Sequence, residues 1–377
     1  MPNKLNIEDI LQREKQRTSA EDKLLSEAVI YNMPIALELR GDLNREGLKR
    51  SFERIIRRHE ILRTIFKENE TGEAYQEIKE EIEIYEEIDL RLKEDKEVLL
   101  EEYKEREASW KFKLDEGPLC RIKLLLMEES YNVLLITMHH IISDGWSLNI
   151  LFKELSKLYS GYKRGEELEL KEQEIQYVDY SIWQRQWLSG ENLEKQLNYW
   201  KKRLEGIPLE MGLPMDRPRP KELSYKGGHY YFELGEEVST RVKEICNREG
   251  VSLYMFLLSV LNVLLYKLSG NSDIVVGSPI AGRHYEEVEG LIGFFVNTLV
   301  MRNEVKGSKS FKELLYEVRE NSLESYQYQD IPFEKLVDSL DIERATNKNP
   351  LFQVMIDIKN IDNNELYLLD EITIKNV

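Results

Sequence analysis

Residues 133–147 read VLLITMHHIISDGWS and combine three kinds of local structure in one short stretch. Five of the first six residues are apolar, which predicts a fully buried strand. The Asp-Gly pair at 144–145 is typical of a turn, and a helical pattern follows it. Two of the chain's five histidines, His139 and His140, lie at the end of the strand. Because imidazole takes and returns a proton near neutral pH, the stretch predicts a functional site at this junction.

The length and charge of the chain limit the kinds of protein it can be. Its 377 residues exceed the usual size of a single hydrophobic core, so we expect two domains or lobes. The formal charge of −17, from 70 acidic and 53 basic residues, argues against a nucleic acid or an anionic membrane as partner. Solubility alone explains this acidic balance equally well.

The cysteines and the apolar segments indicate the cellular compartment of the protein. Cys120 and Cys246 lie far apart in apolar segments, which predicts two buried thiols in a reducing environment. The N-terminus lacks the apolar core of a signal peptide. The long apolar stretch 253–268 contains polar residues and is too short to span a bilayer. We therefore expect a cytoplasmic protein with no membrane partner.

Periodicity predicts a mixture of helices and strands along the chain. The predicted strands are residues 35–39, 63–67, 74–78, 120–126, 133–138, 230–234 and 273–277. The predicted helices are residues 7–26, 44–59, 96–112, 148–158, 178–188, 193–204, 238–248, 253–265 and 311–326. Because the two kinds of element do not alternate strictly, the fold class is predicted as α/β, or an α+β sandwich.

A proline-rich segment suggests how the chain is divided. Three prolines within residues 213–220 exclude a helix or a central strand and predict a crossover. We expect an N-terminal lobe in residues 1–175 and connecting helices with the crossover in 176–220. Residues 221–377 are expected to form a C-terminal lobe.

The residues after the double histidine suggest a chemistry. A glycine at 145 lets a substrate approach the backbone closely. The amides of Gly145 and Trp146 begin a predicted helix, where partial positive charge stabilises an oxyanion. The sequence has no glycine-rich phosphate loop, no Gly-x-Ser-x-Gly elbow and no thiol nucleophile setting. The pattern therefore favours direct acyl transfer assisted by a base.

Two other interpretations of the stretch compete with this one. A strand-ending turn with satisfied core histidines is the structural alternative, and the combination of residues favours function over it. His139, His140 and Asp144 could also offer three metal ligands. Neighbouring residues on a strand point to opposite faces, however, so the two imidazoles should diverge. The sequence thus predicts no metal site.

Six motifs, in the expected order, resemble those of the condensation domains of nonribosomal peptide synthetases, of the chloramphenicol-acetyltransferase-like superfamily. They are RHEILRTIF (58–66), MHHIISDGWS (138–147), YVDYSIW (177–183), IGFFVNTL (292–299), QDIPFE (329–334) and NPLF (349–352). The resemblance covers roughly residues 31–357.

The resemblance implies a fold and an activity. Two chloramphenicol-acetyltransferase-like lobes would form a V-shaped pseudo-dimer with a central tunnel. The activity would be peptide-bond formation, in which an acyl or peptidyl group moves from an upstream carrier-protein thioester to the amine of a downstream aminoacyl thioester. No cofactor would be bound intrinsically, because the substrates arrive on 4'-phosphopantetheine arms. The partners would be donor and acceptor peptidyl carrier domains and an adjacent adenylation domain.

The resemblance also assigns roles to residues of the second motif. His140 would be the catalytic histidine, either as base or by positioning the amine, and Gly145 would act with it. His139 and Asp144 would support the site. A buried carboxylate needs a partner. Arg63 and Arg283 are the best candidates for Asp144, because both lie in stretches that match the family.

Three further residues are candidates for the tunnel or the inter-lobe crossing, namely Trp146, Ser147 and Asn297. The amide of Asn297 lies in an apolar run and needs hydrogen-bond partners. His59, Trp183 and the pair Phe294-Phe295 are predicted to serve packing.

The chain departs from the family pattern at three places. Residues 12–19 occupy the place of the first motif, and only Arg17 fits it. Tyr328 stands where histidine or asparagine is usual. The chain ends at Val377, so the C-terminal lobe is expected to be incomplete.

Three matters stay open at this point. One alternative function is a free-standing acyltransferase that uses acyl-coenzyme A or a soluble amine, and another is a catalytically silent recruitment module. Within the family, residues 180–185 and 216–220 favour a D-configured donor.

Overall fold

The computed structural model describes residues 29–166, 168–221, 227–340, 342, 347–359 and 372–376. Its contacts group the chain into two compact units. The first unit consists of Met1–Gln186, Arg283–Phe295 and Ile361–Val377, and the second of Trp187–Gly282 and Val296–Asn360. The units are therefore interleaved along the sequence, and the segment 283–295 returns to the first unit.

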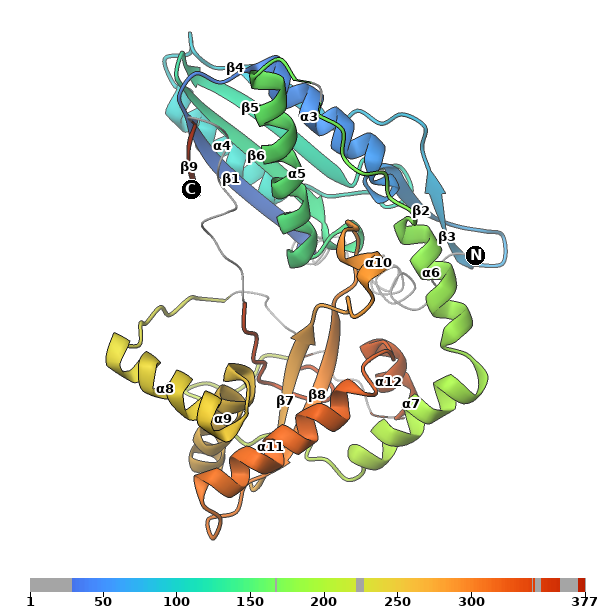
Figure 1. The fold of residues 1–377 in the computed structure, drawn as a ribbon, viewed down its shortest axis with the longest axis vertical. Helices are drawn as coiled ribbons and strands as arrows, with labels where there is room; N and C mark the ends of the chain where they lie inside the picture. The colour runs from blue at the N-terminus through green and yellow to red at the C-terminus, as the bar shows by residue number, and fades with distance from the viewer. Residues whose placement is uncertain are drawn as a thin grey trace. The chain divides into compact units, whose positions relative to one another are not determined.

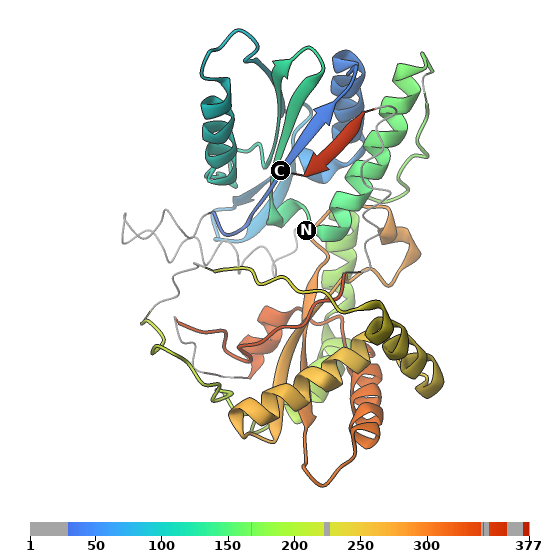
Figure 2. The same cartoon turned by 90° about the vertical axis from the view of Figure 1, so that its left-hand side faces the viewer.

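A five-stranded sheet with the order β4-β5-β6-β1-β9 forms the centre of the first unit. Its strands are β1 (Asn32–Arg40), β4 (Tyr85–Asp89), β5 (Cys120–Glu128), β6 (Tyr131–His139) and β9 (Thr373–Asn376). Among the described pairs of this sheet, only β4–β5 is parallel. Figure 2 shows β9 beside β1 at one edge of the sheet.

Helices cover both faces of this sheet. The side chains of β6 alternate, so that Leu134 and Ile136 join one apolar cluster while Val133 and Leu135 join another. The first cluster lies under α3 (Arg45–Arg58) and α5 (Gly145–Lys163), and the second under α4 (Lys96–Ala108) (Figure 1). The prediction of a fully buried strand at 133–138 is therefore confirmed.

The strand–turn–helix junction has the predicted form. β6 ends at His139, and a short 3₁₀ turn, His140–Ile142, follows it. Asp144 caps α5 by accepting a hydrogen bond from the backbone amide of Ser147. A strand, a turn and a capped helix thus hold the two histidines on rigid backbone.

Besides the short 3₁₀ helix Glu60–Arg63, the first unit contains two further described strands and two further described α-helices. They are the hairpin strands β2 (Thr64–Glu68) and β3 (Ala74–Ile78), and the helices α6 (Tyr177–Trp187) and α10 (Glu286–Glu289). α10 lies in residues 283–295, which we call the strap. The strap leaves the second half of the sequence and packs in the first unit.

The second unit is built around the antiparallel pair β7 (Asp273–Ile280) and β8 (Asn297–Glu304). Its helices are α7 (Gly190–Arg203), α8 (Glu236–Glu249), α9 (Leu253–Ser269), α11 (Phe311–Tyr326) and α12 (Phe333–Ser339). Ser310 and Glu313 form a capping box that starts α11. Buried side chains of α9, α11 and both strands share one apolar core.

The strand predicted at 230–234 is wrong. These residues form no ladder with any described strand, and Tyr230 is 89% exposed. A strand needs a neighbour to satisfy its backbone groups, and a sequence pattern does not supply that neighbour.

Two other expectations concern the ends of the chain and the membrane. The helix predicted at 7–26 and the place of the first motif at 12–19 lie outside the described residues. In the part of the chain that the structure describes, no single helix is long and apolar enough to cross a membrane. Only α8 and α9 taken together, bent by 108°, reach that length and composition.

Candidate functional site

The two adjacent histidines have different surroundings. His139 is buried, and its Nδ1 accepts a hydrogen bond of 3.1 Å from the backbone amide of Ile141. The rings of Tyr31 and Phe112 lie beside it, with centroids at 5.8 and 5.9 Å. Burial lowers the pKa of His139 to about 3, and the neighbouring His140 adds to the effect. His139 is therefore neutral and part of the core.

His140 is half-buried and has no hydrogen bond to its ring among the described residues. Its backbone amide donates to the carbonyl of Tyr31 at 2.8 Å, which fixes the main chain. Its Nδ1 is buried and finds no hydrogen-bond partner in the part of the chain that the structure describes. The ring of Phe294 meets the imidazole edge to face, with centroids 5.2 Å apart and planes at 89°.

The carboxylate of Asp144 is fully engaged inside the first unit. One oxygen, Oδ1, accepts from the amide and hydroxyl of Ser147 at 2.8 and 2.7 Å. The other, Oδ2, accepts from the amide of Phe295 at 3.0 Å. Arg283 lies 3.3 Å from Oδ1, and both side chains are buried. The predicted pairing of Asp144 with an arginine is confirmed for Arg283.

Arg63 does not share this role. Its Nε donates to the carbonyl of Ile56 at 3.2 Å, and Nη1 donates to the carbonyl of Lys79. These bonds tie the end of α3 to the β2–β3 hairpin. The structure therefore does not bring Arg63 and Asp144 together as a pair.

Arg283 fastens the strap to the start of α5. Its Nη1 donates to the carbonyls of Val288 and Leu291, both at 2.6 Å, and its guanidinium lies 3.9 Å from the ring centroid of Phe295. Burial lowers the pKa of Arg283, and the charge of Asp144 opposes that effect. Because a guanidinium keeps its charge in proteins, the strap is held by a buried ionic network.

Ser147 lies at the centre of the same network. Its hydroxyl contacts Oδ1 of Asp144 at 2.7 Å and the carbonyl of Gly293 at 2.9 Å. It also accepts from the amide of Gly293 at 3.0 Å and from Arg283 at 2.9 Å. Since Ser147 is buried and its hydroxyl has four neighbours, it joins helix and strap.

Trp146 and Gly145 are the exposed residues of the junction. Trp146 is 43% exposed, and its indole donates to the carbonyl of Glu289 in the strap at 3.0 Å. Gly145 has no unusual backbone angle, and a Cβ built on it would meet nothing within 4 Å. The fold itself therefore does not require a glycine at 145.

Sequence reasoning missed Tyr177 and Gly293 of this site and gave Phe294 only a packing role. The hydroxyl of Tyr177 donates to the carbonyl of Phe294 at 2.9 Å. A Cβ on Gly293 would lie 2.2 Å from the Tyr177 ring, so only glycine fits there. All three residues lie in matched motifs, which is the signal that could have found them.

Asn297 belongs to the second unit, and its side-chain amide forms its hydrogen bonds there. Its Nδ2 donates to the carbonyls of Gln329 and Ile331, both at 2.8 Å. Its Oδ1 accepts from the amides of Thr298 and Phe333 at 2.8 and 3.0 Å. The amide joins the start of β8 to the loop before α12.

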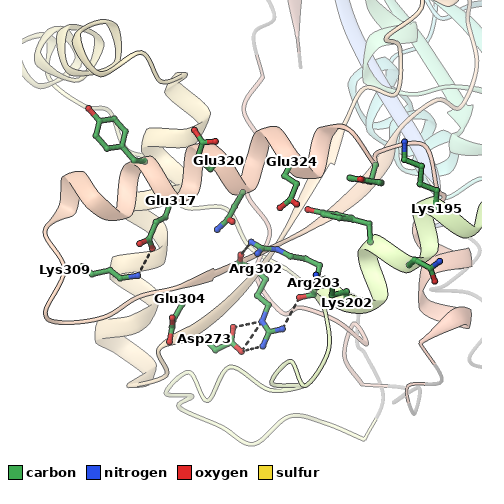
Figure 3. A pocket seen from close by; sticks show the side chains of 15 residues that line it. Lys195, Lys202, Arg203, Asp273, Arg302, Glu304, Lys309, Glu317, Glu320 and Glu324 are labelled. Carbon is green, nitrogen blue, oxygen red and sulfur yellow. Dashed lines mark hydrogen bonds and ion pairs between the residues drawn. The ribbon is translucent and has the colours of Figure 1, made fainter. Parts of the chain in front are cut away.

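A cavity of about 1260 Å³ in the second unit contains none of the predicted site residues. It lies among α7, β8 and α11 (Figure 3). Charged residues of its wall pair with one another, for example Arg302 with Asp273 and Lys309 with Glu317, both at 2.7 Å. Within the described residues, no three His, Cys, Asp or Glu side chains are grouped to hold a metal ion.

Comparison with known proteins identifies relatives of the chain. The family model "Condensation domain" matches residues 10–375. A linear gramicidin synthase of Brevibacillus parabrevis is 44% identical over 350 residues, which are 92% of this chain and 4% of that protein. Gramicidin S synthase 2 of Aneurinibacillus migulanus is 38% identical, over 96% of this chain and 8% of that protein. The chain thus spans a small part of the length of these relatives.

Solved structures share the fold. The X-domain from teicoplanin biosynthesis is 26% identical with a TM-score of 0.81, covering 92% of this chain and 77% of that one. The condensation domain from Monacolin K polyketide synthase, 21% identical, also has a TM-score of 0.81, covering 96% of this chain and 84% of that one. The predicted α/β, chloramphenicol-acetyltransferase-like fold is confirmed. The chain belongs to the condensation domain family of nonribosomal peptide synthetases.

Proposed function

We propose that this chain catalyses peptide-bond formation between two carrier-bound substrates. An upstream carrier-protein thioester would supply the acyl or peptidyl group, and a downstream aminoacyl thioester would supply the amine. The observation that carries the proposal is the difference between the two histidines. His139 is bonded, buried and neutral, whereas His140 is half-buried at the end of a rigid strand, and no hydrogen bond to its ring occurs among the described residues.

The reaction balances without a cofactor. The amine nitrogen attacks the thioester carbonyl carbon, the new C–N bond forms and the C–S bond breaks. The amine loses one proton, and the leaving phosphopantetheine thiolate gains one. Nε2 of His140 would accept the proton from the amine and return it to the thiolate, or would hold the amine in line for attack.

The surroundings of His140 favour a modest role for base catalysis. In a Ser-His-Asp triad, a carboxylate behind the histidine stabilises the imidazolium. Here Nδ1 of His140 has no acceptor among the described residues, and the nearby Asp144 is engaged by Ser147, Arg283 and Phe295. A general base contributes about 10²–10⁴-fold. We expect the contribution of His140 to lie at or below the lower end of this range. Bringing the two substrates together would supply the rest of the rate enhancement.

Gly145 fits the role of a backbone donor. The start of α5 carries free amides and partial positive charge, which would stabilise the oxyanion of the tetrahedral intermediate. The open space over Gly145 leaves room for the reacting carbonyl group. A side chain there would occupy that space without disturbing the fold.

The partners follow from the family. Donor and acceptor carrier domains would present the substrates on 4'-phosphopantetheine arms, and an adenylation domain would load the acceptor. We keep a D-configured donor as part of the proposal, on the sequences of residues 180–185 and 216–220.

The test is a condensation assay with two loaded carrier proteins. We expect His140→Ala to lower the rate of amide formation by about 10- to 100-fold. His229→Ala is the matched control, because His229 is an exposed histidine of the second unit, and it should leave the rate unchanged. Equal rates for His140→Ala and wild type would remove His140 from the mechanism. D- and L-configured donors are compared in the same assay.

A second candidate function is a silent recruitment module. It is favoured by the likeness to the X-domain from teicoplanin biosynthesis, which has been solved in complex with OxyB. Absence of any amide product from loaded carriers, acyl-coenzyme A or soluble amines, with a tailoring enzyme captured in a pull-down, would favour that candidate. Turnover with acyl-coenzyme A but not with acyl-carrier would instead indicate a free-standing acyltransferase.

A further inference from the structure

The orientation of the His140 ring needs a physical cause. A histidine that exchanges protons with a substrate is usually held by a hydrogen bond at its other ring nitrogen. Among the described residues, no group bonds Nδ1 of His140. The contact that remains is the edge-to-face ring of Phe294, with centroids 5.2 Å apart and planes at 89°. This angle and distance are those of a favourable aromatic pair.

The backbone of Phe294 is fixed at three consecutive residues. The amide of Gly293 donates to Ser147 at 3.0 Å, the carbonyl of Phe294 accepts from Tyr177 at 2.9 Å, and the amide of Phe295 donates to Asp144 at 3.0 Å. Gly293 also packs so closely on Tyr177 that a Cβ would clash. These contacts hold the backbone of Phe294 in place beside His140.

We propose that Phe294 is the positioning residue of His140, and that the buried Asp144–Ser147–Arg283 network acts on the reaction through Phe294. This inference rests on the proposed function in one respect only, namely that His140 is the reacting group. An aromatic contact fixes the direction of the imidazole but supplies no acceptor for its second proton. The strap thus sets where Nε2 points and leaves the protonation of the ring to the substrate.

The strength of the contact between Phe294 and His140 sets the size of the effect on kcat. An edge-to-face pair shifts the population of one ring orientation by roughly 3- to 10-fold. We expect Phe294→Leu, which keeps apolar volume but removes the ring, to lower kcat by about that factor with KM within about twofold. Phe294→Tyr keeps the ring and should restore kcat to within about twofold of wild type.

Phe311→Leu is the matched control. Phe311 forms a similar pair with Phe256 in the second unit, with centroids 5.6 Å apart and planes at 73°. Loss of that ring should leave kcat and KM unchanged. A fall in kcat for Phe311→Leu equal to that for Phe294→Leu would mean that general destabilisation explains both, and would overturn the proposal.

A spectroscopic measurement tests positioning without the reaction. In protein with ¹³C-labelled histidine, the ring signals of His140 are assigned by their loss in His140→Ala. We expect Phe294→Leu to move these signals, because the ring current of Phe294 disappears, while the signals of His139 stay in place. Ser147→Ala loosens the strap without touching either ring, and should move the His140 signals in the same direction by a smaller amount.

The outcomes separate the two proposals. If His140→Ala keeps full activity, the proposed role of His140 in the reaction fails, and the His140 signals still report whether Phe294 orients the ring. Unchanged His140 signals in Ser147→Ala, or a Phe294→Tyr enzyme as impaired as Phe294→Leu, would overturn the positioning role. If Phe294→Leu does not fold, Ser147→Ala and Phe294→Tyr still test whether Phe294 positions the ring of His140.

Discussion

Two carboxylate–arginine pairs, one in each unit, differ in burial more than in geometry. Asp144 and Arg283 contact at 3.3 Å, with side chains 4% and 0% exposed. Asp273 and Arg302 contact at 2.7 Å, with side chains 31% and 23% exposed. Water can replace either partner of the second pair but neither partner of the first. The longer contact is therefore the one whose loss leaves an uncompensated buried charge.

The two pairs also hold different kinds of structure. Asp273 and Arg302 lie on β7 and β8, which are already joined by a ladder of backbone hydrogen bonds. Asp144 and Arg283 join α5 to the strap, whose contacts with α5 and α6 are side chain–backbone hydrogen bonds together with ring contacts of Phe295. The buried pair thus orders a segment beside His140, whereas the exposed pair reinforces a sheet that forms without it.

The largest expected effect comes from breaking the buried pair. Arg283→Met removes the guanidinium but keeps most of the volume, and leaves the buried carboxyl group of Asp144 without its ionic partner. We expect a loss of about 3–5 kcal/mol in the free energy of unfolding, measured by denaturant titration. The rate of amide formation should fall as well, because the strap no longer fixes the position of Phe294.

The double variant Arg283→Met/Asp144→Asn tests whether the unpaired carboxyl group of Asp144 causes that loss of stability. An asparagine keeps the cap of α5 but carries no charge, so part of the lost stability should return. A double variant less stable than the sum of both single changes would contradict the view that an unpaired charge is the cause.

Low pH should also lower the stability of the first unit, by a smaller amount. Burial lowers the pKa of His139 to about 3, whereas its ordinary value is 6.5. The unfolded chain therefore takes up the proton first, so the stability from neutral His139 is present above about pH 6.5 and is lost as the pH falls towards 3. One pH unit corresponds to about 1.4 kcal/mol, so about 2 kcal/mol should be lost between about pH 6.5 and about pH 5.

The measurement is the free energy of unfolding at both pH values. His139→Asn should show a smaller decrease than wild type, while His229→Asn, a change at an exposed histidine of the second unit, should follow wild type. Parallel pH profiles for wild type and His139→Asn would show that other groups cause the acid sensitivity.

The junction at 133–147 is predictable from sequence because its signals are local. An apolar run, a turn pair and a helical pattern lie next to one another, and the register of β6 then buries His139 and ends the strand before His140. The arginine partner of Asp144 is also within reach of sequence reasoning, because a buried carboxylate needs a cation and Arg283 is one of the two best candidates in stretches that match the family.

The remainder of the fold and the site depends on contacts between distant residues. The strand β4 has neighbouring acidic residues and an edge position, so nothing in its pattern distinguishes it from a loop. The run 230–234 has a strand pattern but no described neighbour. For Phe294 the sequence predicts only packing, since its place against His140 exists only once the strap has returned to the first unit.

The smallest expected effect comes from breaking the exposed pair. Asp273→Asn removes the charge opposite Arg302 while keeping a hydrogen-bond acceptor. Arg302 also donates to the carbonyls of Arg203 and Glu205 at 3.0 and 2.8 Å, and these bonds survive the change. Because the pair is partly solvated, we expect a loss of about 1 kcal/mol or less in the free energy of unfolding.

Salt dependence sharpens the contrast between the two pairs. Salt screens solvated charges but reaches buried ones poorly, so the loss in Asp273→Asn should shrink towards zero in about 1 M NaCl. The loss in Arg283→Met should persist in the same salt, because no ion enters the network around Asp144. Equal salt sensitivity of the two losses would mean that burial is not what separates the pairs, and that water reaches the strap after all.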